Sequence, residues 1–135
     1  MIIQSTAPAR VSLFGGSTDV SPYCDLYGGE VISMAITLYS KLLLLVRLET
    51  EGILFDLFPY HADPELFLAI RSYFLESNAS FRILSEFDGV IGAGLGSSGS
   101  ATIALMGAIY KKQGKNLSNL FDLAHLGWGL ESKFH

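Results

Sequence analysis

The sequence has 135 residues, half of them apolar, which fits a single domain, or part of one, with a sizeable core. It carries 9 basic and 13 acidic residues and no basic run, so its charge does not favour nucleic-acid binding. The single Cys24 excludes an internal disulfide, and no Cys or His spacing suggests structural zinc. We therefore expect the protein to occur in a reducing cytoplasm. The apolar stretches are shorter than the roughly 20 residues that span a bilayer, and no secretory signal begins the chain.

Short strands around a long irregular segment are predicted for the first half of the chain. Pro8 favours an extended residue before it, and the glycines at 15 and 16 open a loop that continues to about Glu30 with a short helical turn. The apolar run from Leu42 to Val46 is typical of a strand buried on both faces. The predicted strands are Ile2 to Gln4, Arg10 to Phe14, Val31 to Ile36, Tyr39 to Glu49 and Ile53 to Phe58.

Helices dominate the predicted second half. Asp63 is a suitable N-cap for a helix that begins at Pro64, and Gly114 is a suitable C-cap for the next helix. The predicted elements are the helix from Pro64, a strand from Phe81 to Phe87, a buried helix from Ser98 to about Gln113, and a last helix that starts at Ser118. The last helix has no stop signal, so we expect the sequence to end inside a domain.

The segment from Gly92 to Ala101 joins the predicted strand to the buried helix. Glycines let a ligand approach the main chain, and the N–H groups at the start of a helix favour an anion. Such a place suits phosphate. The hydroxyls of Ser97, Ser98 and Ser100 can donate to phosphate oxygens or, in one case, ligate magnesium.

Three other interpretations of this loop compete here. A Walker A loop needs a lysine after its last glycine, and this loop has none. The letters from Gly94 to Gly99 match the dinucleotide fingerprint G-x-G-x-x-G, but the acidic Asp122 lies in a second helical pattern rather than at the end of a strand. A glycine turn that serves only tight packing stays open as the third alternative.

Two segments together resemble the GHMP kinase superfamily, named for galactokinase, homoserine kinase, mevalonate kinase and phosphomevalonate kinase. The segment Ala7-Pro8-Ala9-Arg10-Val11-Ser12-Leu13-Phe14-Gly15-Gly16-Ser17-Thr18-Asp19-Val20 is similar to the amino-terminal motif of its sugar kinases. The segment Gly92 to Ala101 resembles the family's ATP-binding loop. Gly15-Gly16 departs from the Gly-Glu-His of true galactokinases and is closer to the heptose-phosphate branch.

The resemblance implies an α+β, two-layer fold like that of ribosomal protein S5 domain 2, with a left-handed βαβ crossover, here incomplete. Residues 1–135 would form a truncated amino-terminal, ATP-binding domain without the carboxy-terminal domain. It also implies ATP-dependent phosphorylation of a hydroxyl of a sugar or sugar phosphate, with ATP and Mg2+ as cofactors. The family's catalytic aspartate would follow the last residue, so we expect little turnover from this chain alone.

The resemblance also implies roles for individual residues. Arg10 matches a basic residue near the transferred phosphoryl group, and the substrate would contact Asp19, Gly16 and Thr18. Magnesium would be held by Ser98 and Glu131. The phosphate-binding residues would be Gly92, Gly94, Leu95, Gly96, Ser97, Ser98, Gly99 and Ser100.

Simpler roles remain open for several of these residues. Arg10 could pair with a surface carboxylate, Asp19 could bond its own turn, and Glu131 could be a solvated helix residue. We expect Trp128 and the Phe residues in the core, and His61 to be an ordinary loop residue. A non-catalytic sensor or scaffold that binds sugar and nucleotide is the main alternative function, and a dinucleotide-binding oxidoreductase is the second. A homodimer is left open, and neither nucleic acid nor a membrane is expected as a partner.

Overall fold

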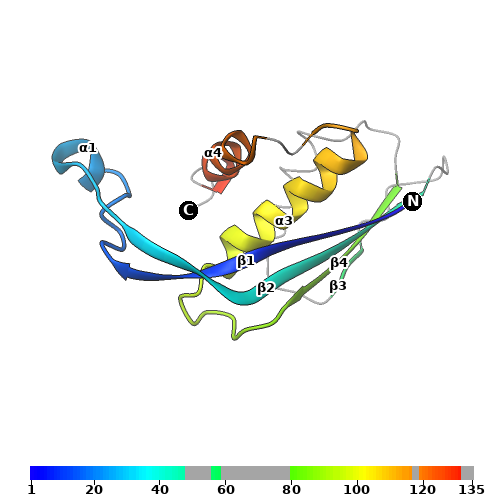
Figure 1. The fold of residues 1–135 in the computed structure, drawn as a ribbon, viewed down its shortest axis with the longest axis horizontal. Coiled ribbons are helices and arrows are strands. Elements are labelled where there is room, and N and C mark those ends of the chain that lie inside the picture. Colours follow the sequence, from blue (N-terminus) through cyan, green and yellow to red (C-terminus); the bar gives the residue numbers. More distant parts are fainter. Residues whose placement is uncertain (48–55, 59–79, 117–118, 132–135) are drawn as a thin grey trace.

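The computed structural model describes residues 1–47, 56–58, 80–116 and 119–131. In this part of the chain a sheet of four strands, in the order β1-β2-β4-β3, carries α3 and α4 on one side (Figure 1). The elements are β1 (Ile2–Phe14), α1 (Tyr23–Tyr27), β2 (Ile32–Arg47), β3 (Asp56–Phe58), β4 (Ser80–Phe87), α3 (Ser97–Lys112) and α4 (Leu120–Glu131). The predicted helix from Pro64, with its cap Asp63, and His61 lie outside the described residues.

The first two strands form one long antiparallel hairpin. The prediction of four separate strands in this region is wrong, because β1 runs unbroken through Pro8 and β2 runs unbroken from residue 32 to residue 47. Pro8 is tolerated because β1 lies at the edge of the described sheet, where a residue without an N–H group can face outward. The register shifts between Pro8 and Arg10, so Pro8 marks an irregularity rather than an end. The predicted short helical turn is confirmed as α1.

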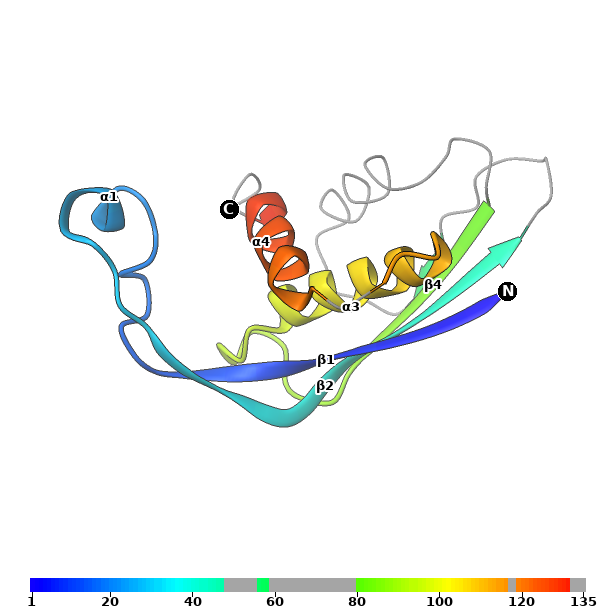
Figure 2. The same ribbon diagram turned by 45° about the horizontal axis from the view of Figure 1, so that its top comes forward.

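One face of β2 carries the centre of the core. Leu42, Leu44 and Val46 are 2%, 0% and 8% exposed, whereas Leu43 and Leu45 between them are only half-buried. The expectation of a strand buried on both faces is therefore wrong for the described residues. Alternate side chains of a strand point to opposite faces, and the described helices cover only one of them (Figure 2).

The helix α3 packs directly on this face of the sheet. A Cβ added at Gly107 would lie 3.0 Å from the Oγ of Ser5 in β1, so helix and strand approach closely. The helix ends in a Schellman motif, in which Gly114 has φ 69° and donates to Lys111 O while Lys115 N donates to Tyr110 O. Both the buried helix and its glycine cap are confirmed. The core consists of Ile3, Ala7, Leu42, Leu44, Val46, Ile83, Ala101, Ala104, Leu105, Met106, Ala108, Ile109 and Leu123.

The last helix, α4, packs on α3 rather than on the sheet. A Cβ added at Gly127 would lie 2.8 Å from Ile103 Cδ1, and Leu123 is buried. Asn119 caps the helix, since its Oδ1 accepts from the N–H of Asp122 at 3.3 Å, whereas the predicted cap Ser118 lies outside the described residues. Trp128 is 61% exposed, so its expected place in the core is wrong.

The strand pairing identifies the fold class. Strands β1, β2 and β4 pair antiparallel, and β3 pairs parallel to β4. Helices on one side of such a sheet give the expected two-layer α+β fold, and this pairing excludes the parallel sheet of a dinucleotide-binding domain for the described strands. The segment that links β3 to β4, where the crossover would lie, is outside the described residues. None of the helices described is long and apolar enough to cross a membrane.

Candidate functional site: a glycine loop at the start of a buried helix

The loop between β4 and α3 contains three glycines with positive φ. The φ values are 78° at Gly92, 73° at Gly94 and 67° at Gly96, a region that favours glycine over other residues. A Cβ added at Gly92 or Gly94 would meet no atom of the described residues within 4 Å. The first two glycines are therefore not required by tight packing, and they leave open space beside the main chain.

The start of α3 has the properties of an anion site. Gly96 is the N-cap, with φ 67° and ψ 35°, and no side chain caps the helix by a hydrogen bond. The first bond of the helix is from Ser100 N to Gly96 O at 3.0 Å. The N–H groups of a first helical turn have no acceptor within the helix, and the helix dipole places partial positive charge beside them. A phosphate group fits this arrangement.

Arg10 lies against the same loop. Its backbone N–H donates to Leu95 O at 3.0 Å, which joins the edge strand β1 to the loop. A Cβ added at Gly96 would lie 3.1 Å from Arg10 Cγ and 3.5 Å from Cζ, so the arginine side chain crosses directly over the N-cap. The guanidinium donates to Ser12 Oγ at 2.8 Å and is exposed. The structure thus brings a permanent positive charge next to the start of α3.

The three loop serines face different surroundings. Ser100 is 6% exposed, and its hydroxyl donates to Ser97 O at 3.0 Å. Its Oγ also lies 2.6 Å from the Oγ of Ser40 in β2, so Ser40 donates in that bond. The Ser100 hydroxyl is therefore turned toward the sheet, where it anchors the helix. Ser97 and Ser98, with Leu95 and Gly99, are partly exposed on the loop side.

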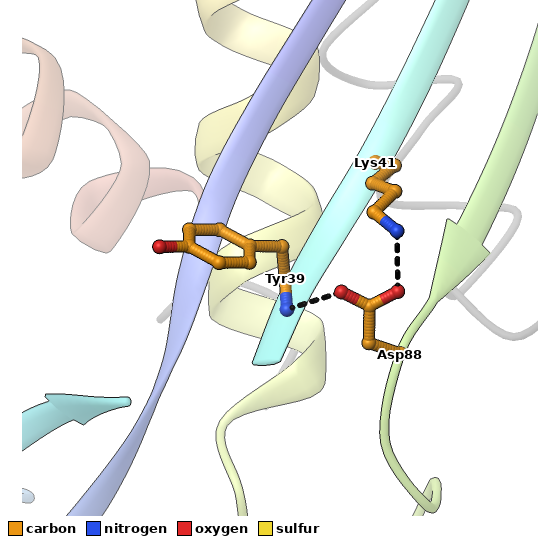
Figure 3. Close-up of polar contacts among 3 residues, drawn as sticks. All are labelled: Tyr39, Lys41 and Asp88. Carbon is orange, nitrogen blue, oxygen red and sulfur yellow. Dashed lines mark hydrogen bonds and ion pairs between the residues drawn. The ribbon is translucent and has the colours of Figure 1, made fainter. Parts of the chain in front are cut away.

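Asp88, at the other end of the loop, was not singled out by sequence reasoning (Figure 3). Its backbone N–H donates to Tyr39 O at 3.0 Å, and its carboxylate accepts from Tyr39 N at 3.1 Å and from Lys41 Nζ at 2.6 Å. The bond from Lys41 and the Tyr39 amide lower the pKa of Asp88, and the same bond to Asp88 raises the pKa of Lys41. The sequence offered two signals for this pair: a lysine inside an apolar strand, and an aspartate directly after another strand.

The substrate candidates of the first motif, Gly16, Thr18 and Asp19, lie apart from the glycine loop. The Thr18 hydroxyl bonds Gly15 O at 2.7 Å and Glu30 O at 3.0 Å and accepts from Glu30 N, so it holds its own loop closed. Gly16 and Asp19 are exposed in this loop. Both views place the end of the hairpin that carries α1 away from the start of α3 (Figures 1 and 2). Among the candidate site residues of the first motif, Arg10 is the one with described contacts to the loop.

The magnesium candidates are only partly described. Ser98 lies in the first turn of α3 and is partly exposed. Glu131 is the last residue of α4, and the placement of its side chain is not described. No group of three acidic, His or Cys residues gathers within the described ranges. Mg2+ commonly takes few protein ligands and completes its shell with water and substrate phosphates, so one hydroxyl beside a phosphate loop fits it.

Comparisons with known proteins agree with this geometry. Residues 65–135 match the family described as GHMP kinases N terminal domain. A stretch of 54 residues, 40% of this chain, is 43% identical to the D-glycero-alpha-D-manno-heptose 7-phosphate kinase of Campylobacter jejuni and covers 16% of that protein.

Two solved structures show the same fold over nearly the whole chain. One is a D-glycero-D-manno-heptose 1-phosphate kinase from Bacteroides thetaiotaomicron, with a TM-score of 0.74, 27% identity and 98% of this chain covered. The other is the Methanococcus jannaschii mevalonate kinase, with a TM-score of 0.71, 27% identity and 100% covered. The chain spans 48% and 47% of those two proteins, about half their length. With the matched profile, the two-layer fold and the glycine loop in agreement, this chain belongs to the GHMP kinase family.

Proposed function

We propose that this chain binds the triphosphate of ATP at the start of α3 and forms that part of a kinase acting on a hydroxyl of a sugar or sugar phosphate. The observation that carries the proposal is the loop from Gly92 to Gly96, with three positive φ values, open space at two glycines and an N-cap without a side chain. Backbone N–H groups and the helix dipole would there replace the water around phosphate oxygens.

Within this site the described residues have distinct roles in the proposal. The main chain of the loop holds the phosphates, and the Arg10 guanidinium beside Gly96 stabilises negative charge that develops on the transferred group. Ser98 is the proposed magnesium ligand in the first turn, with Glu131 as a second candidate at the end of α4. Phosphoryl transfer depends mainly on positioning and charge neutralisation, which the loop and the adjacent arginine would supply.

For the acceptor we propose a heptose phosphate or a related sugar phosphate. The support is the similarity to two heptose-phosphate kinases, at 43% identity over 54 residues and at 27% identity over nearly the whole chain. Asp19 and Gly16 are exposed in the loop after β1 and remain the proposed contacts to the sugar. The Thr18 hydroxyl is used within the loop, so we propose that it shapes this contact rather than making it. A cytoplasmic location is proposed with this substrate.

Thermal shifts with magnesium-ATP, magnesium-GTP and NAD test nucleotide binding. A ligand at about 100 times its Kd stabilises the folded state by about 2.7 kcal/mol, so we expect a clear rise in Tm with magnesium-ATP and none with NAD. Ser98→Ala should weaken ATP binding mainly when magnesium is present. Ser33→Ala, at an exposed position of β2, is the matched control and should change nothing. Stabilisation by NAD alone would contradict the proposal.

The expectation of little turnover by these 135 residues alone stays a prediction. It is checked by incubating the purified chain with labelled ATP and heptose phosphate. Substantial ATP-dependent phosphorylation would contradict it, whereas binding of magnesium-ATP without turnover is the expected result.

A further inference from the structure

Three consecutive residues of β2 hold both ends of the glycine loop. The backbone of Tyr39 exchanges hydrogen bonds with Asp88, and Lys41 forms an ion pair with the same carboxylate at 2.6 Å. Between them, the Ser40 hydroxyl bonds the hydroxyl of Ser100 in the first turn of α3. Asp88 stands just before the loop and Ser100 just after it, so one short stretch of β2 sets the distance between the loop's two ends.

The two attachments use opposite faces of the strand. Side chains alternate along β2, so Ser40 points to the face covered by α3, where it is 2% exposed, and Lys41 points to the other face. Figure 3 shows Asp88 beside β2 with its carboxylate held by Tyr39 N and Lys41 Nζ. The side-chain attachments at the two ends of the loop therefore reach β2 from opposite faces of the strand.

The part of the loop between these attachments has little other support among the described residues. A Cβ at Gly92 or Gly94 would touch no described residue, and between these attachments a backbone bond from the sheet joins Arg10 to Leu95. The direction of the loop N–H groups therefore depends on where its ends are fixed. The ladder between β2 and β4 ends at the pair of Ser40 and Phe87, so Asp88 is the first residue that the ladder itself no longer fixes.

We propose that Lys41 and Asp88 form a positioning pair for the phosphate loop, which sets its affinity for the triphosphate although neither side chain contacts the ligand. This inference rests on the proposed function. An exposed ion pair contributes little to stability, and here the side chains are 42% and 24% exposed. The carboxylate nevertheless accepts from two donors at once, which fixes its direction and with it the backbone that begins the loop.

Five variants separate positioning from general charge effects. Asp88→Asn and Lys41→Met each remove the ion pair, and the double variant removes both partners. Lys41→Arg keeps a cation that can reach the carboxylate, so it should retain the wild-type affinity and loop exchange. Glu86→Gln is the matched control, because Glu86 lies opposite Lys41 in the register and carries the same charge as Asp88, whereas the described bond of Lys41 goes to Asp88.

Two measurements are made on each variant of the whole chain. Titration calorimetry gives the Kd for magnesium-ATP, and hydrogen exchange without nucleotide gives the protection of the loop amides. We expect Asp88→Asn and Lys41→Met each to weaken binding by about 3- to 20-fold, with a change in Tm below about 4 °C. The double variant should resemble either single variant, since the two residues act as one pair.

The outcomes distinguish this inference from the proposed function. Weaker binding and faster loop exchange in Asp88→Asn and Lys41→Met, with wild-type values in Lys41→Arg and Glu86→Gln, support the positioning pair. Wild-type affinity in Asp88→Asn, or equal losses in Glu86→Gln, overturn it while leaving the proposed function intact. Absence of ATP binding in the wild type overturns the proposed function, and unchanged loop exchange in Asp88→Asn then overturns the positioning role as well.

Discussion

Gly15 and Gly16 are neighbours with very different constraints. A Cβ at Gly15, which has φ 78°, would lie 1.8 Å from Glu30 O, whereas a Cβ at Gly16 would meet nothing within 4 Å. Gly15 must therefore be glycine so that the two sides of the loop can approach each other. Gly16 is free to vary as far as the described structure is concerned, which suits a residue exposed to a ligand.

We expect Gly15→Ala to destabilise the loop and Gly16→Ala to be tolerated. The left-handed backbone alone costs about 1–2 kcal/mol for a residue with a Cβ, and the clash with Glu30 adds to that. Urea unfolding and hydrogen exchange over residues 15–31 provide the measurement. Gly16→Ala, the control, should stay within about 0.5 kcal/mol of the wild type. Equal effects of the two changes would show that the close approach to Glu30 is not maintained in solution.

The ion pair of Lys41 and Asp88 predicts a dependence of stability on pH. The bond from Lys41, and then that from the Tyr39 amide, lower the pKa of Asp88. The stabilisation by the ionised Asp88 is therefore fully present above its pKa in the unfolded chain, about 3.9. It is lost as the pH falls through the lower pKa of the folded chain. The bond to Asp88, with the charges of Asp88 and Glu86, raises the pKa of Lys41. The stabilisation by the charged Lys41 is fully present below its pKa in the unfolded chain, about 10.4. It is lost as the pH rises through the higher pKa of the folded chain.

We expect the difference in Tm between the wild type and Asp88→Asn to be constant from about pH 5 to about pH 9. It should shrink below and above this range, because one partner then loses its charge. Thermal unfolding at closely spaced pH values checks this. A difference that persists unchanged at about pH 2 would show that the ion pair is not its origin.

At the scale of elements, the contact between α3 and β2 includes a buried pair of hydroxyls. Ser40 and Ser100 are 2% and 6% exposed, and their Oγ atoms lie 2.6 Å apart. Ser100 has a further acceptor in Ser97 O, whereas the described bond of the Ser40 hydroxyl is the one to Ser100. Losing one partner therefore has different consequences for the two residues.

We expect Ser100→Ala to cost about 1–3 kcal/mol, because it leaves the buried Ser40 hydroxyl without this partner. Ser40→Ala should cost less, since Ser100 retains Ser97 O. The double variant should be more stable than Ser100→Ala alone, because replacing both polar groups removes the unsatisfied one. Urea unfolding of the three variants completes the cycle. Additive losses would mean that the two hydroxyls do not bond each other in solution.

Elements could be predicted from sequence where local chemistry was sufficient. Helix α3 was predicted because its residues are apolar around most of the circumference, and Gly114 marked its end through the positive φ that a Schellman motif requires. The continuity of β1 could not be predicted. The local sequence around Pro8 predicts the end of a strand. Only the place of Pro8 at the edge of the described sheet makes it compatible with a long strand.

Considering the whole molecule, apolar side chains on α4 and on the outer hairpin face away from the described core. Phe121 and Trp128, seven residues apart and hence on one side of α4, are 86% and 61% exposed. Phe14 and Tyr27, at the end of the hairpin near α1, are 70% and 75% exposed. Large apolar surfaces of this kind are typical of contact areas with another protein surface.

We expect the chain to associate in a concentration-dependent way through the exposed side of α4. Phe121→Ser combined with Trp128→Ser should reduce this association, because both changes remove apolar surface without touching the buried Leu123. Sedimentation velocity over a range of concentrations provides the measurement. Asn116→Ser, at an exposed polar position, is the control. A purely monomeric wild type would contradict the expectation.

The sequence by itself determined the glycine loop, its helix and the family resemblance, because glycine conformations and helix ends are local properties of neighbouring residues. The tertiary structure alone decided which distant residues support that loop. Lys41 and Asp88, Ser40 and Ser100, and Arg10 and Leu95 meet only because β1, β2 and β4 pair in one register with α3 on one face. Such contacts depend on strand pairing across long stretches of chain, which no local pattern encodes.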